Sequence, residues 1–144
     1  MIQNETSEPG VIVREVRIAA RPETVYAFFV DPQKIIQWIG ERAELDPRPG
    51  GICRVRMNEQ ATALGKFIEL VPYSRVVFSW GWEGEESAVP AGSSTVEVRL
   101  VPDGAGTLVR LRHSGLPLSE QPSHAGGWTH FLALLAATAG APAG

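Results

Sequence analysis

Apolar and polar residues alternate along most of this chain, which is the pattern expected of half-buried β-strands. The clearest case is Val76, Phe78, Trp80 and Trp82, which occupy every second position. Because the intervals between the alternating segments are short and carry turn residues, we expect the strands to form an antiparallel sheet. The predicted strands cover residues 11–19, 52–57, 64–71, 76–82, 95–100 and 107–113.

A helical period replaces this alternation near the end of the chain. Trp128, Phe131, Leu132 and Leu135 fall at i, i+3, i+4 and i+7, which is the apolar stripe of an amphipathic helix. We expect this helix from residue 119 to about residue 139. One long helix in a mostly strand-forming chain needs a broad sheet to bury its stripe. The sequence therefore predicts an α+β fold in which a curved sheet wraps around the helix, with a cavity between them.

Prolines and chain length complete the predicted organisation. Pro22 and Pro32 are each suited to the first position of a helix, so two short helices are expected after the first strand. The 144 residues are enough for one domain with a core of its own. We expect this domain over residues 11–139, with a flexible N-terminus at residues 1–10 and a flexible tail at residues 140–144.

Charge and cysteine content argue against several classes of function. The net charge of −3 offers no electrostatic basis for binding nucleic acid or an anionic membrane. Cys53 is the single cysteine, so no internal disulfide and no cysteine-based metal cluster can form. No apolar run approaches the roughly 18 residues of a membrane span. The polar first residues do not resemble a secretory signal, so a cytoplasmic location is expected.

Aromatic residues provide the candidate binding site. Large rings rarely fill a core completely, and each tryptophan N–H needs a hydrogen-bond partner. Any single ring could equally belong to a plain core, but the set as a whole favours a cavity for a small apolar molecule. The cavity candidates are Trp38, Phe67, Phe78, Trp80, Trp82, His113, Trp128, Phe131 and Leu132.

Two histidines are candidates for a polar role. His113 shares a strand face with Val109 and Leu111, so it should point inward, where burial would lower the pKa of its imidazole. It could be a hydrogen-bonded core residue, a polar handle on a ligand, or a general acid or base. His124 comes early in the long helix, near the mouth of the expected cavity, where it could be solvated, cap the helix or act as an acid or base. His130 lies off the apolar stripe and is expected at the surface.

Glu69 is the carboxylate of most interest. If Phe67 faces inward, strict alternation brings Glu69 inward too, where its pKa would rise. Otherwise Glu69 lies on the outer face of the sheet and pairs with a neighbouring arginine. That face is expected to carry cross-strand charge pairs and to be solvated or to form a homodimer surface. Its charged residues would include Arg54, Arg56, Glu97, Arg99, Arg110 and Arg112.

Metal and nucleophilic chemistry have little support in the sequence. The histidines form no His-x-x-x-His pair and have no tight carboxylate cluster, so neither a metal site nor a cofactor is expected. Ser93 and Ser94 do not lie in a nucleophile elbow. Alternation directs Arg54 away from Cys53, which argues against activation of the thiol. No catalytic residue is assigned.

Two adjacent glycines interrupt the predicted long helix. Gly126 and Gly127 each cost roughly 1 kcal/mol of helix stability relative to alanine. Close approach of the helix to another element would explain them, and so would a bend that admits a ligand. The sequence does not choose between these explanations.

Several short motifs resemble a known superfamily. Gly65-x-Phe67, and Pro72 ahead of Val76-Val77-Phe78-Ser79-Trp80, resemble the START-like (SRPBCC, helix-grip) proteins. Residues 107–116 and His124-x-x-Gly127-Trp128 resemble the branch named after the heat-shock-protein-90 ATPase activator. The resemblance implies a seven-stranded antiparallel sheet that grips a long C-terminal helix, with a cavity that often takes an apolar ligand. The co-chaperone's stimulating activity needs an additional N-terminal domain, for which this chain has no room, so a chaperone partner is not expected.

Three functions follow as hypotheses. The first is binding of an aromatic or lipid-like molecule in the cavity. The second is an enzyme similar to the superfamily's cyclases or dehydratases, with His113, His124 or Glu69 as acid or base. The third is a module that contacts a chaperone or regulator. Two titratable groups within reach of one point in the cavity would favour the enzyme, and an apolar cavity without such a pair would favour binding. A filled cavity with a large exposed apolar patch would favour the module.

Overall fold

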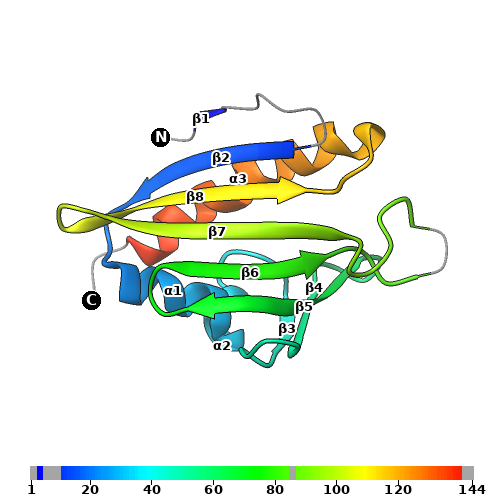
Figure 1. Cartoon of the computed structure of the whole chain (residues 1–144), viewed down its shortest axis with the longest axis horizontal. Helices are drawn as coiled ribbons and strands as arrows, with labels where there is room; N and C mark the ends of the chain where they lie inside the picture. The colour runs from blue at the N-terminus through cyan, green and yellow to red at the C-terminus, as the bar shows by residue number, and fades with distance from the viewer. Residues whose placement is uncertain (1–2, 5–10, 85–86, 141–144) are drawn as a thin grey trace.

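The structure, a computed structural model, describes residues 3–4, 11–84 and 87–140. Its strands form one antiparallel sheet in the order β1-β2-β8-β7-β6-β5-β4-β3, and the long helix α3 lies against one face of this sheet (Figure 1). The strands are β1 (Gln3–Asn4), β2 (Val11–Ile18), β3 (Arg42–Leu45), β4 (Ile52–Arg56), β5 (Thr62–Val71), β6 (Arg75–Trp80), β7 (Ser94–Asp103) and β8 (Gly106–Ser114). The helices are α1 (Pro22–Val30), α2 (Pro32–Ile35), the 3-10 turn η1 (Leu118–Glu120) and α3 (Gln121–Ala139).

The predicted helix-grip fold is confirmed. Strands β2 to β8 make the seven-stranded sheet, β1 adds two residues at its edge, and α1 and α2 follow β2 as expected. The predicted flexible ends, residues 1–10 and 140–144, lie almost entirely outside the described residues. Together with the domain limits at residues 11 and 139, they stay predictions.

The structure differs from the predicted strands most clearly at β3, which was not predicted, and at the end of β6. Strand β3 is missed by the alternation pattern because it is a short edge strand whose inward residues, Ala43 and Leu45, are only half-buried. Strand β6 ends at Trp80, and Trp82 forms only isolated bridges. The alternation therefore continues past the end of the regular sheet.

Helix α3 buries most of its predicted apolar stripe. Trp128, Leu132 and Leu135 are buried, whereas Phe131 is half-buried. Full burial of a leucine side chain contributes roughly 1.5–3 kcal/mol. The part of α3 from Leu132 onward is therefore firmly packed, and its first turns border the cavity described below.

Strand β8 alternates as the sequence predicts. Val109, Leu111 and His113 are buried, while Arg110 and Arg112 are exposed on the opposite face. This alternation places the His113 imidazole in the core, between the sheet and α3.

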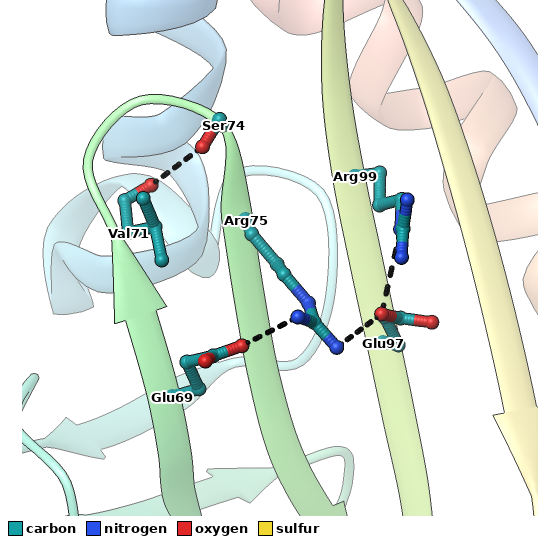
Figure 2. A network of polar contacts seen from close by, with 6 residues as sticks. All are labelled: Glu69, Val71, Ser74, Arg75, Glu97 and Arg99. Atoms are coloured by element: carbon teal, nitrogen blue, oxygen red, sulfur yellow. Dashed lines mark hydrogen bonds and ion pairs between the residues drawn. The ribbon is translucent and has the colours of Figure 1, made fainter.

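The inward direction considered for Glu69 is wrong. Phe67 is buried, but the pairing of β5 with β6 shifts register between Phe67 and Glu69, and a bulge of this kind disrupts the strict alternation. The Glu69 carboxylate therefore lies on the outer face, 2.8 Å from the guanidinium of Arg75, which also bridges Glu97 (Figure 2). This position removes Glu69 from the acid–base candidates of the cavity.

The outer face carries further charge pairs of the predicted kind. Because each pair has at least one side chain that is substantially exposed, each contributes about 0–1 kcal/mol to stability. They are Arg54 with Glu44 and Glu83, Arg56 with Glu41, Arg99 with Glu97, and Arg110 with Glu15.

Candidate functional site

A cavity of about 210 Å³ opens beside the first turns of α3. Its wall combines residues of α3 with the end of β6, with Trp82 just after it, and with single residues that follow α2 and β4. Among the described residues that line it, none is an Asp, Glu, Lys or Arg. The lining residues are Ile39, Met57, Trp80, Trp82, Ser123, His124, Gly127, Trp128 and Phe131.

Aromatic rings make the cavity wall continuous from the sheet to the helix. The ring of Trp80 lies 5.5 Å, centroid to centroid, from both Trp82 and Trp128. The ring of Trp82 lies 6.0 Å from that of His124. Edge-on and tilted contacts at these distances contribute about 0.5–1.5 kcal/mol each beyond the area they bury. The wall is therefore an aromatic surface that is already formed in the free protein.

His113 lies beneath this wall and joins the sheet to α3 by hydrogen bonds. The indole Nε1–H of Trp128 donates to His113 Nδ1 at 2.9 Å, so Nδ1 is the unprotonated nitrogen and Nε2 carries the proton. His113 Nε2–H then donates to Ser94 Oγ at 2.8 Å. The Ser94 hydroxyl in turn donates to the carbonyl oxygen of Trp80 at 2.8 Å. Both imidazole nitrogens are thus occupied by partners within the protein.

The electrostatics of His113 agree with a neutral core residue. Burial, with a smaller contribution from the nearby charge of His124, lowers the pKa of the His113 imidazole from 6.5 to about 3. The direction of this shift is the one predicted from the sequence. His113 is fully buried and does not line the cavity, so it has no free atom to offer a ligand.

His124 and Trp80 differ from His113 because each has an unpaired nitrogen. His124 Nδ1 is 2.8 Å from the backbone carbonyl oxygen of Glu120, whereas its Nε2 is buried without a partner in the described structure. Trp80 Nε1 is likewise buried and unpaired there. The hydroxyl of the neighbouring Ser123 donates to the same Glu120 carbonyl at 3.1 Å. The buried polar atoms of the wall that lack a partner therefore come from one histidine and one tryptophan.

Close packing does not explain the two glycines of α3. A Cβ added at Gly126 or at Gly127 would meet no atom of another element within 4 Å, so the close-approach explanation is wrong. Gly127 lines the cavity, whereas Gly126 does not and is exposed. The absence of a side chain at residue 127 keeps open a part of the cavity that a larger residue would occupy.

The cavity brings together some of the residues singled out in the sequence and leaves others in the core. Those that line it are Trp80, Trp82, His124, Trp128 and Phe131. Those buried outside it are Trp38, Phe67, Phe78, His113 and Leu132. Alternation directs Met57 inward, which was a usable signal for the lining, and Gly127, an unfavourable residue inside a helix, was another. No sequence signal pointed to Ile39 or Ser123.

Other reactive chemistry finds no site in the described part of the chain. Burial raises the pKa of the Cys53 thiol to about 12, so the nucleophilic thiolate is scarce at neutral pH. Within residues 3–4, 11–84 and 87–140, no group of three or more His, Cys, Asp or Glu side chains could hold a metal ion. None of the helices in the same ranges is long and apolar enough to cross a membrane.

A sheet that grips a long C-terminal helix, with an aromatic cavity beside that helix, defines a START-like helix-grip protein. The sequence profile of the family described as "Activator of Hsp90 ATPase homolog 1-like protein" matches residues 19–140, which is most of the chain. The protein belongs to this family, as its motifs predict. No curated relative matches the chain.

Solved structures agree with this assignment. An AHSA1-like protein from Rhizobium etli is 46% identical over 90% of this chain and 81% of its own, with a TM-score of 0.71. CalU16 from Micromonospora echinospora is 25% identical over 96% of this chain and 86% of its own, with a TM-score of 0.76. A protein from Chromobacterium violaceum is also 25% identical, over 94% of this chain and 100% of its own, with a TM-score of 0.78.

Proposed function

We propose that this protein binds a small apolar molecule, with a single ring or two fused rings, in the cavity beside α3. The observation that carries the proposal is a preformed cavity of about 210 Å³ whose wall is aromatic and free of charged lining residues. Ligand sites commonly combine an apolar wall with a few polar groups that orient the ligand. Here the lining includes the imidazole of His124, the hydroxyl of Ser123 and the indole N–H groups of Trp80 and Trp82.

The size of the cavity limits the ligand. An apolar cavity of roughly 150 Å³ can hold benzene, and drug-sized ligands occupy roughly 300–1,000 Å³. A volume of about 210 Å³ therefore suits a bicyclic aromatic compound better than a long acyl chain. Naphthalene is a suitable probe because it has two fused rings and no polar atom.

Binding is favoured over catalysis because the cavity lacks a second titratable group. His124 is the one titratable residue among the described lining residues. Its ring lies 5.6 Å from that of His113, but both nitrogens of His113 are already hydrogen-bonded. Glu69 lies on the outer face. An acid–base pair would need two groups that reach one reacting atom, and we infer that this cavity holds its ligand without converting it.

The alternative of a chaperone- or regulator-binding module is less well supported. It predicts a filled cavity, whereas this cavity is open, and the exposed apolar side chains lie on several separate elements. They are Ile68, Val71, Tyr73, Val101, Leu118 and Leu134. A cytoplasmic location and a homodimer formed through the outer face of the sheet stay predictions, and the mass in solution would test the second.

A pair of glycine variants tests the proposed site. Leucine at residue 127 should extend into the cavity, whereas leucine at residue 126 should extend into solvent. Both substitutions raise helix propensity by a similar amount, so they are matched in their effect on α3. We expect Gly127→Leu to abolish naphthalene binding and Gly126→Leu to retain it.

Tryptophan fluorescence and calorimetry provide the readout. Naphthalene should alter the emission of Trp80, Trp82 and Trp128, and it should raise the melting temperature, because a ligand that binds only the native state stabilises that state. Equal binding to both glycine variants would place the ligand elsewhere. Failure of the unmodified protein to bind any compound of one or two rings would overturn the proposal.

A further inference from the structure

Two buried nitrogens of the cavity wall have no hydrogen-bond partner in the described structure. They are Nε1 of Trp80 and Nε2 of His124, and both side chains line the cavity. An unsatisfied buried polar atom destabilises the folded state, so each requires an explanation. A ligand that supplies the missing partners is one.

The hydrogen bond of His124 to the backbone defines what its free nitrogen can do. His124 Nδ1 is 2.8 Å from the carbonyl oxygen of Glu120. Because a carbonyl oxygen can only accept, Nδ1 must carry a proton. In the neutral imidazole the other nitrogen, Nε2, then has no proton and is an acceptor. The ring is also held by its contact with Trp82, at 6.0 Å between centroids.

The free nitrogen of Trp80 has the opposite character. An indole N–H can only donate. The two buried unpaired nitrogens therefore offer one acceptor and one donor, and the described lining residues carry no Lys or Arg to bind a carboxylate and no Asp or Glu to bind an amine. A hydroxyl is the smallest neutral group that both donates and accepts.

We propose that the preferred ligand is a compact aromatic molecule with one hydroxyl group, which donates to Nε2 of His124 and whose oxygen is available to the N–H of Trp80. This inference rests on the proposed binding function and adds the chemical class of the ligand. Both nitrogens are covered by neighbouring atoms in the free protein, so side chains of the lining must shift to expose them. Met57 lines the cavity and is unbranched and flexible, which suits it to such a shift.

Three related compounds test this inference because they differ in one group. Naphthalene has no polar atom, methoxynaphthalene can accept but not donate, and naphthol can do both. Transfer of a hydroxyl from water into an apolar site is unfavourable unless the site forms hydrogen bonds with it. Without the His124 contact, naphthol should bind more weakly than naphthalene. With that contact, we expect naphthol to bind roughly three- to tenfold more tightly than methoxynaphthalene, and also more tightly than naphthalene.

Variants of His124 identify the group responsible. His124→Phe retains a ring beside Trp82 and removes the acceptor, so the ratio of naphthol to naphthalene affinity should fall below one. His124→Gln supplies an amide oxygen near the position of Nε2, and the preference for naphthol should return. His130→Phe changes a histidine on an exposed part of α3 and should leave the ratio unchanged.

The outcomes of this titration distinguish the two proposals. If naphthol binds more weakly than naphthalene to the unmodified protein, or if His124→Phe leaves their affinity ratio unchanged, the hydroxyl preference is wrong. The proposed binding site would still be supported if Gly127→Leu abolished binding of these compounds. If none of the three compounds binds the unmodified protein, both proposals fail.

Discussion

Replacement of His113 by leucine should remove a large part of the pH dependence of stability. The His113 imidazole is fully buried, and its pKa is lowered from 6.5 to about 3 mainly by burial. In the unfolded chain the imidazole has its ordinary pKa. Between pH 6.5 and pH 3 the unfolded protein therefore binds a proton at this residue that the folded protein does not bind. Stability rises with pH wherever the unfolded state holds more protons, so acidification across this window destabilises the fold.

The size of this effect follows from the shift. One pKa unit corresponds to about 1.4 kcal/mol. Lowering the pH from 7 to 5 should therefore cost the folded protein roughly 2 kcal/mol through His113 alone, and the whole window should cost on the order of 4 kcal/mol. His113→Leu should also lose roughly 1–3 kcal/mol at neutral pH, because the Trp128 indole N–H and the Ser94 hydroxyl lose a partner.

Urea unfolding at several pH values measures both the pH-dependent loss of stability and the loss that His113→Leu causes at neutral pH. The free energy of unfolding of the unmodified protein should fall between pH 7 and pH 5 by roughly 2 kcal/mol more than that of His113→Leu. Other titrating groups contribute to both proteins, so most of their effect cancels in the difference. Equal pH dependence of the two proteins would show that His113 is not held as a buried neutral imidazole, and the hydrogen-bond chain through Trp128 would be wrong.

Three further outcomes are expected from the contacts described above. Cys53 should react with thiol reagents much more slowly in the native protein than in urea, because burial raises its pKa to about 12; rapid native labelling would show that the thiol is accessible. Arg75→Met should reduce the free energy of unfolding by no more than about 1 kcal/mol, because its pairs with Glu69 and Glu97 are partly exposed. Ser94→Ala should cost roughly 1–3 kcal/mol, since it leaves His113 Nε2–H without an acceptor, and a neutral effect would argue against this bond.

The fold could be predicted because local patterns and global packing agree. Alternation in β4, β6, β7 and β8 and the helical period of α3 each survive in the structure. Strand β3 could not be predicted, because an edge strand with half-buried residues leaves little periodic signal. The register shift between Phe67 and Glu69 could not be predicted either, since it depends on how β5 pairs with β6 rather than on the residues of β5 alone.

The candidate site was harder to predict than the fold. The alternation of side chains along a strand predicts which of them point inward. For β8 it correctly separated the buried His113 from the exposed Arg110 and Arg112. Alternation cannot tell whether an inward ring fills the core, as Phe67 does, or borders a cavity, as Trp80 does. That distinction depends on the space left between elements distant in sequence. The burial that keeps His113 neutral and the contacts that leave His124 Nε2 unpaired also depend on elements distant in sequence.

The methyl signal of Met57 tests the central claim most directly. The chain contains two methionines, so a spectrum of protein labelled at the methionine methyl groups is simple, and Met57 lines the cavity. Addition of naphthalene should shift the Met57 methyl resonance through the ring current of the ligand and should produce nuclear Overhauser contacts between this methyl and the ligand protons. Gly127→Leu should abolish both effects, and Gly126→Leu should preserve them. A Met57 methyl that neither shifts nor contacts naphthalene at saturating concentration would contradict a ligand site in this cavity.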